Sequence, residues 1–141
     1  MKKNKKVLII KFGALGDIIM FSGVISALNK IFNNRVDIDW AIGGNLSSIP
    51  MYFEGLNKIF TVNEENIYKK NFFYQFIEII KFNFFLIFKK YDYIYVGHPD
   101  SRYKLLLLTS FFSKKILLSI GNIRYPRLNK NYYNEYIEIL E

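Results

Sequence analysis

The chain of 141 residues has no cysteine and a single histidine. The absence of cysteine excludes disulfide bonds and cysteine-ligated metals, and one histidine excludes a histidine-rich metal site. Long apolar runs are also missing: the run after the basic start "MKKNKK" stops at Lys11, too early for the apolar region of a signal peptide. We therefore expect a cytoplasmic, single-domain chain without a metal site.

Acidic residues are few, with 12 Asp and Glu against 20 Lys and Arg, which gives a formal net charge of +8. This surplus fits an ordinary basic surface, or attraction to nucleic acid, phosphates or an acidic membrane face. The lysines occur in scattered pairs, and neither an aromatic RNA-binding signature nor zinc-finger spacing is present. We therefore do not expect a nucleic-acid partner.

Short apolar runs alternate with segments of helical spacing along the chain. The runs predict strands over residues 7–10, 36–42, 58–62, 91–97 and 115–120. The helical spacing predicts helices over residues 17–32, 46–53, 71–90 and 101–112, and a further helix beginning within 131–141. The alternation predicts an α/β fold with a Rossmann-like, doubly wound, mostly parallel sheet of about five or more strands.

The segment 71–90 is the most apolar part of the chain, and Gln75, Glu78 and Lys81 form a narrow polar stripe along it. A membrane span needs roughly 20 uninterrupted apolar residues, so we do not expect one here. We expect a helix packed on the sheet. The alternative is a helix partly exposed to a membrane surface, because a pair of lysines flanks each end.

Three polar breaks follow expected strands: "KFGALGD", "GGN" and "GHPDSR". Ligands of parallel sheets gather at these carboxyl ends. "KFGALGD" is not a P-loop, because Asp17 follows Gly16 where a P-loop has lysine and then serine or threonine. It also lacks the glycine spacing of a dinucleotide fingerprint. A tight turn that needs positive φ and a ligand-binding loop both remain open.

Asp17 also has two interpretations. A carboxylate near a helix start is stabilised by the helix dipole and often caps backbone N–H groups. The same position lies at the edge of the sheet where substrates bind, and a carboxylate there can remove a proton from a hydroxyl.

Several segments together resemble the amino-terminal half of the heptosyltransferases, glycosyltransferase family 9: "VLIIKFGALGDIIMFSGVISAL", "DIDWAI", "SSIP" and "YDYIYVGHPDSRYKLLLL". That family typically begins with an apolar strand, a basic residue, a short turn ending in Gly-Asp and an apolar helix. Its second strand commonly carries Asp-Trp, as Asp39 and Trp40 do here. "NEYIEIL" resembles the helix that leads toward the second domain of the family.

The resemblance implies a GT-B enzyme with two Rossmann-like domains and the active site between them. Residues 1–130 would form the acceptor-side domain, and residues 131–141 would begin the helix leading to a second domain that this chain lacks. The second domain of the family binds most of the nucleotide-sugar. We therefore expect the chain alone to be inactive.

The family transfers a sugar, often heptose from ADP-heptose, to a growing lipopolysaccharide core, with inversion and without a metal ion. The nucleotide-sugar is a substrate, and no cofactor is implied. Asp17 matches the general base that the family is proposed to use. The resemblance makes these residues substrate-binding candidates: Lys11, Gly13, Gly16, Asn45, His98 and Arg102. Lys11 and Arg102 would hold anionic groups of the acceptor.

A lipid-linked acceptor implies peripheral contact with the inner face of the cytoplasmic membrane, which the positive charge and the Phe-rich segment 71–90 would suit. Two other hypotheses stay open. One is a noncatalytic Rossmann-like module that binds a nucleotide or phosphosugar, and the other is a fragment that docks on a separate partner domain.

Overall fold

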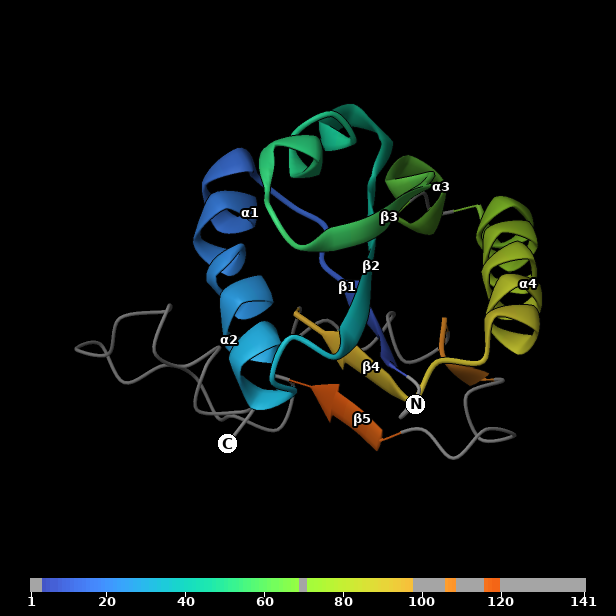
Figure 1. Ribbon diagram of the computed structural model, residues 1–141. Coiled ribbons are helices and arrows are strands. Elements are labelled where there is room, and N and C mark those ends of the chain that lie inside the picture. The colour runs from blue at the N-terminus through green and yellow to red at the C-terminus, as the bar shows by residue number, and fades with distance from the viewer. Residues whose placement is uncertain (1–3, 69–70, 98–105, 109–115, 120–141) are drawn as a thin grey trace.

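The computed structural model describes residues 4–68, 71–97, 106–108 and 116–119. One sheet of parallel strands has the order β3-β2-β1-β4-β5 (Figure 1). The strands are β1 (Lys5–Ile10), β2 (Val36–Gly43), β3 (Leu56–Val62), β4 (Tyr93–Val96) and β5 (Ile116–Ser119). The expected α/β class and parallel sheet are confirmed.

Helices cover both faces of the sheet (Figure 1). They are α1 (Leu15–Phe21), α2 (Gly23–Ile31), α3 (Glu64–Tyr68) and α4 (Phe72–Lys89). On one face, α1 and α2 pack on a core that includes Ile9, Ile38 and Trp40. On the other face, α3 and α4 pack on a core that includes Leu8 and Ile94. Burial of β1 from both sides explains why its apolar run is continuous.

The single helix expected over residues 17–32 is wrong in one respect, because the structure has two helices separated at Ser22. The Ser22 hydroxyl donates a hydrogen bond to the Ile19 carbonyl at 2.6 Å, and the Ser22 N–H is shared between the carbonyls of Ile18 and Ile19. Serine side chains compete for backbone groups in this way and weaken a regular helix. The expected stop is confirmed, because Asn33 and Asn34 have positive φ after α2.

The short helix expected over residues 46–53 is also wrong. Two separate 3-10 turns occupy this stretch, η1 (Gly44–Leu46) and η2 (Pro50–Tyr52). Proline is suited to the first turn of a helix but has no N–H to continue one, so Pro50 starts a new turn instead. The helix α3 was not expected from the sequence.

The strand order places β1 between β2 and β4. The chain builds β1, β2 and β3 outward in one direction and then crosses back to begin β4 on the other side of β1. Such a reversal creates a crevice at the carboxyl edge of the sheet, where ligands bind. The stretch "KFGALGD", which forms the turn after β1 and the start of α1, lies at this switch point. The helices expected over residues 101–112 and 131–141 lie outside the described residues, apart from 106–108.

Candidate active site

The turn between β1 and α1 is shaped by Gly13 and covered by Asp17. Gly13 has a φ of 120°, a backbone conformation that L side chains rarely adopt. A Cβ at Gly13 would lie 3.6 Å from Oδ2 of Asp17, so the carboxylate sits over the turn. Asp17 is half-buried in the first turn of α1. Gly16 faces open space, because no atom lies within 4 Å of a Cβ built there.

Lys11 is anchored to β2 through its backbone. Its N–H donates to the carbonyl of Ala41 at 3.2 Å. Its carbonyl accepts a hydrogen bond from Nε1 of Trp40 at 3.3 Å. Trp40 is fully buried, so these bonds attach the start of the turn to the rigid centre of the sheet.

The side chain of Lys11 is only 4% exposed, which is rare for lysine. Burial lowers its pKa, and the negative charge of Asp17 acts in the opposite direction. Its Nζ also lies 5.9 Å from the centre of the Phe21 ring. A cation and a carboxylate therefore sit together at the switch point, where the first can hold an anionic group and the second can accept a proton.

Aromatic rings pack against one another on the α1 side of the sheet, next to Lys11. Phe21 stacks on Tyr95 with ring centres 5.4 Å apart and meets Trp40 edge-on at 5.6 Å. Gly97, which follows β4, leaves room for Phe21 and for the aliphatic part of Lys11, because a Cβ at Gly97 would collide with the Phe21 ring and lie only 3.0 Å from Cδ of Lys11. The glycine therefore permits the close approach of β4 to the turn.

Asp39, beside Trp40, has a structural setting. It is buried, and its two carboxylate oxygens accept hydrogen bonds from Nδ2 of Asn57 at 2.8 Å and from the Tyr91 hydroxyl at 2.7 Å. Burial and the bond to Asp39 raise the pKa of Tyr91. The Asp-Trp pair thus divides two tasks: Asp39 ties β2 to Tyr91 and β3, and Trp40 ties β2 to the candidate site.

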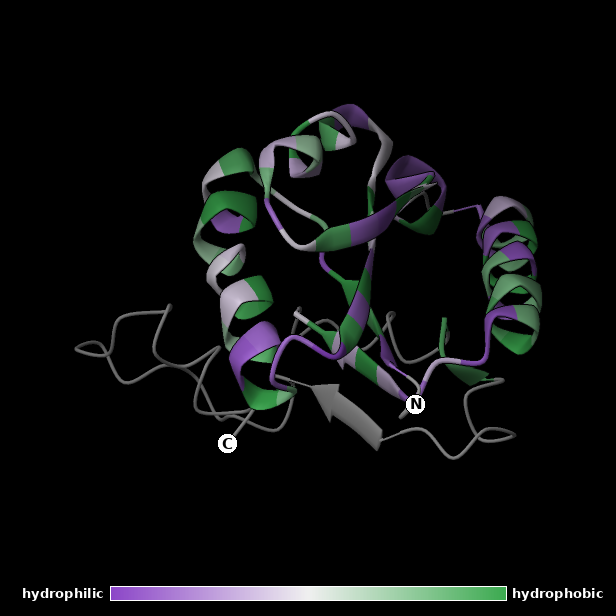
Figure 2. Cartoon of the chain, in the orientation of Figure 1, coloured by the Kyte–Doolittle hydropathy of each residue, from purple (hydrophilic) through white to green (hydrophobic). Residues whose placement is uncertain are grey.

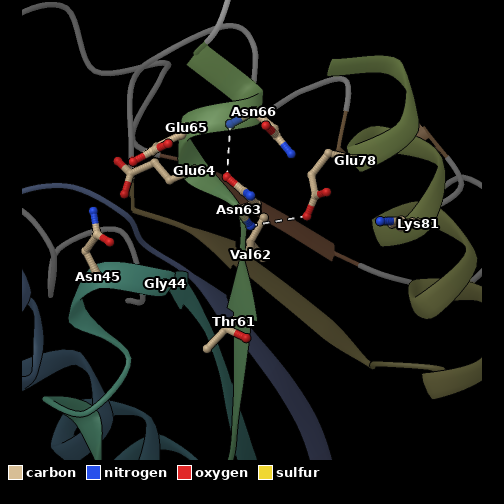
Figure 3. Close-up of a pocket in the computed structure, with 10 residues that line it drawn as sticks. All are labelled: Gly44, Asn45, Thr61, Val62, Asn63, Glu64, Glu65, Asn66, Glu78 and Lys81. Atoms are coloured by element: carbon tan, nitrogen blue, oxygen red, sulfur yellow. Dashed lines mark hydrogen bonds between the residues drawn. The ribbon is translucent and has the colours of Figure 1, made fainter. Parts of the chain in front are cut away.

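A second polar region lies beyond the ends of β2 and β3, where a pocket of about 490 Å³ opens (Figure 3). Asn45 lines it and is exposed. Lys11, Gly13, Gly16 and Asp17 do not line it. The structure therefore groups four of the expected site residues in the turn after β1 and the first turn of α1, and places Asn45 in a separate pocket.

Three charged residues that line this pocket were not predicted as site residues from the sequence: Glu64 on the α3 side, and Glu78 and Lys81 from α4, which the sequence showed only as a polar stripe. The N–H of Asn63 donates to Oε1 of Glu78 at 3.2 Å, which joins the end of β3 to α4 (Figure 3). Burial raises the pKa of Glu64. A signal for α3 was present, because asparagine followed by two glutamates is typical of a helix start, and the Asn63 side chain does accept the N–H of Asn66.

The other two expected site residues, His98 and Arg102, lie outside the described residues. Within the described ranges, no group of three or more histidine, aspartate and glutamate side chains is placed to hold a metal ion.

Solved structures share the fold of this chain. No family model matches the sequence, and no curated protein matches it. A glycosyl transferase family 9 structure from Veillonella parvula aligns with a TM-score of 0.77 and 18% identity over 98% of this chain and 40% of its own. E. coli ADP-heptose lps heptosyltransferase II aligns with a TM-score of 0.76 and 16% identity over 96% of this chain and 40% of its own. E. coli heptosyltransferase WaaC with ADP-2-deoxy-2-fluoro heptose aligns with a TM-score of 0.73 and 13% identity over 95% of this chain and 46% of its own.

The chain shares the fold of these glycosyltransferases. It spans less than half the length of each. The resemblance inferred from the sequence is thus confirmed as a likeness of fold, in the Rossmann-like half of a GT-B arrangement.

Proposed function

We propose that these residues form the acceptor-side part of a metal-independent, inverting glycosyltransferase. One observation carries the proposal: a carboxylate, Asp17, covers a glycine turn at the switch point of a sheet that has the heptosyltransferase fold. This is the edge of the sheet where a substrate hydroxyl can reach a base.

In the proposed reaction, Asp17 accepts the proton of an acceptor hydroxyl. The hydroxyl oxygen forms a bond to the anomeric carbon of the donor sugar, while the bond from that carbon to the diphosphate oxygen breaks. Attack opposite the leaving group inverts the anomeric centre, and the transition state has oxocarbenium character, as in glycoside hydrolysis. Lys11 and Arg102 hold anionic groups of the acceptor, and Gly13 and Gly16 leave room beside Asp17.

The proposed donor is a nucleotide-sugar, with a heptose carried by ADP as the first candidate. Support comes from the E. coli heptosyltransferase WaaC, whose structures hold ADP or ADP-2-deoxy-2-fluoro heptose. The proposed acceptor is a lipid-linked oligosaccharide of the lipopolysaccharide core or a related surface glycan. Asn45 and His98 are also proposed to contact the substrates.

A second domain completes the proposed cleft, either in the same polypeptide or as a partner. Support comes from the span of the alignments, which cover only 40% to 46% of the solved glycosyltransferase chains. Residues 1–130 are proposed to form the acceptor side and residues 131–141 to lead toward the donor side. We expect these 141 residues to bind acceptor but not to transfer sugar without that domain.

The proposed site of action is the cytoplasmic face of the membrane that holds the acceptor, with the protein attached peripherally. Among the described residues, no helix combines the length and the apolar character needed to cross a bilayer.

The test compares wild-type protein with Asp17→Asn in the complete two-domain enzyme, with ADP-heptose as donor and a chelator present. We expect the wild type to form a product of inverted anomeric configuration, resolved by NMR. Asp17→Asn should bind the donor normally and lose about 1000-fold in transfer rate. Donor binding by wild type without transfer to any lipid-linked acceptor would favour the noncatalytic nucleotide-binding alternative.

A further inference from the structure

The side of α4 that faces away from the sheet is lined by large apolar side chains. They recur at helical spacing, and each is between 48% and 67% exposed: Phe73, Phe76, Ile80, Phe84, Ile87 and Phe88. We call these six residues the outer face of α4. At 1.5 Å per residue, the face runs for roughly 22 Å along the helix. Figure 2 shows hydrophobic positions along the whole length of α4, with hydrophilic positions at intervals between them.

The outer face is as large as the largest apolar patches that monomeric proteins typically expose. Six side chains of about 200 Å² each, about half exposed, present roughly 600 Å² of apolar surface. The largest apolar patch on a monomeric protein is typically about 300–600 Å² and often serves an interaction.

Polar side chains of α4 are turned toward the protein. Nε2 of Gln75 donates to the carbonyl of Ile67 at 2.9 Å, and Glu78 accepts the N–H of Asn63. Asn83 is buried and donates to the carbonyl of Ile79 within the helix at 2.8 Å. The one acidic residue of α4 is therefore directed away from the outer face.

Lysines border the outer face. Lys81 and Lys90 are exposed, and Nζ of Lys89 lies 5.6 Å from the centre of the Phe60 ring at the end of the helix. In the sequence, a lysine pair also precedes α4, and the whole chain carries a net charge of +8. Apolar side chains bordered by lysines, on a helix too polar to span a bilayer, are the pattern of a helix that lies in an anionic membrane interface.

We propose that the outer face of α4 is the surface by which the protein lies on an anionic lipid bilayer. The inference deepens the proposed function and rests on it for the lipid-linked acceptor. The bonds from α4 to Ile67 and Asn63 hold its amino-terminal turns against the end of β3. This is the carboxyl edge of the sheet, and Asp17 lies at the same edge, at the start of α1 on the opposite face.

The test measures flotation of the full chain with vesicles of phosphatidylcholine, with and without phosphatidylglycerol. We expect binding to the mixed vesicles that falls with salt. Replacing Phe73, Phe84 and Phe88 by serine should weaken it roughly 100-fold. Lys81→Gln with Lys90→Asn, which suits the left-handed backbone at 90, should weaken it roughly 10-fold. The matched control, Met51→Ser with Tyr52→Ser, removes an exposed apolar pair from η2 and should leave binding unchanged.

A fluorescence measurement distinguishes contact between the outer face of α4 and lipid from binding by misfolded protein. Phe84→Trp adds an indole on the outer face, while the single native tryptophan, Trp40, is fully buried and serves as the reference. Brominated phosphatidylglycerol should quench the new emission and spare that of Trp40.

Three results would overturn the proposal: no binding by a folded monomer, equal binding by the triple serine variant, or a dimer that this variant abolishes in the absence of vesicle binding. The first leaves a protein partner as the occupant, and the last indicates a second copy of the chain. Transfer to a water-soluble acceptor analogue is measured in parallel with the complete two-domain enzyme, whose vesicle binding is tested in the same way. Normal transfer without vesicle binding would reject this inference alone, and vesicle binding without transfer would reject only the proposed function.

Discussion

The helices α2 and α4 flank the same sheet but differ on the side that faces away from it. On α2, apolar residues are buried at Val24, Ile25 and Leu28, while Ser26 and Lys30 are exposed. On α4, Phe82 and Leu86 are buried, and the outer face is apolar as well. The first pattern is that of an ordinary helix packed on a sheet. The second exceeds what packing on the sheet requires.

This difference separates two roles for apolar residues. Those of α1 and α2 create the core beneath Lys11 and Asp17, so they determine folding and the shape of the candidate site. Those on the outer face of α4 lie in water in the described structure and add little to the stability of this fold. Substitutions on the two sides should therefore have very different effects.

The largest expected effect is on the stability of the α1 side. Phe21→Ala removes a buried ring that packs on Trp40 and Tyr95 and should lower the free energy of unfolding by about 3–5 kcal/mol. Phe84→Ala, the same change at a side chain that is 62% exposed, should alter it by less than about 0.5 kcal/mol. Urea unfolding followed by circular dichroism measures both. Equal losses would mean that the outer face of α4 is part of the folding core.

A smaller effect is expected at Lys11, on the α1 side of the carboxyl edge. Burial lowers its pKa, so the unfolded chain holds this proton more tightly and the free energy of unfolding should rise as pH increases toward 10.5. The Lys11→Met protein should be more stable than wild type by about 1 kcal/mol near neutral pH. Its free energy of unfolding should also rise less with increasing pH than that of wild type. Urea unfolding of both proteins between neutral and alkaline pH measures the difference between their free energies of unfolding. Because Tyr91 is present in both proteins, its contribution cancels from this difference. Parallel pH profiles would contradict the prediction.

The smallest effect is expected at Glu64, on the α3 side of the same edge, and its sign is opposite. Burial raises its pKa, so the folded chain holds this proton more tightly than the unfolded chain does. The resulting stabilisation is present below pH 4.5, the ordinary pKa of the group, and is lost as pH rises through the folded-state pKa. Glu64→Gln should show a shallower decline of stability above 4.5 in urea unfolding, with exposed Glu65→Gln as the control. An unchanged decline would mean that burial of Glu64 has no effect on stability.

Strand positions could be predicted from the sequence because burial on both faces leaves an uninterrupted apolar run, as in β1. The two 3-10 turns could not, because the apolar spacing over 46–53 resembles a helix and the proline decides the outcome locally. The break at Ser22 depends on a hydroxyl bond that spacing alone does not reveal.

The glycine turn and Asp17 could also be identified, since both occur in one short stretch. The burial of Lys11 could not, because it depends on Trp40 and Gly97, which lie far away in the chain. The pocket beside Asn45 depends likewise on the contact between Asn63 and Glu78. The burial of Lys11 and the pocket beside Asn45 therefore depend on packing between residues far apart in the chain, which the sequence pattern does not show.

The most direct test of the proposed chemistry is the single-turnover transfer rate of Asp17→Asn in the complete two-domain enzyme. Asp37→Asn is the matched control, because Asp37 lies near the start of β2 and accepts a hydrogen bond from Asn4 at 2.9 Å. We predict a loss of about 1000-fold for Asp17→Asn with donor affinity retained, and a wild-type rate for Asp37→Asn. A rate for Asp17→Asn close to that of wild type would contradict the assignment of Asp17 as the base.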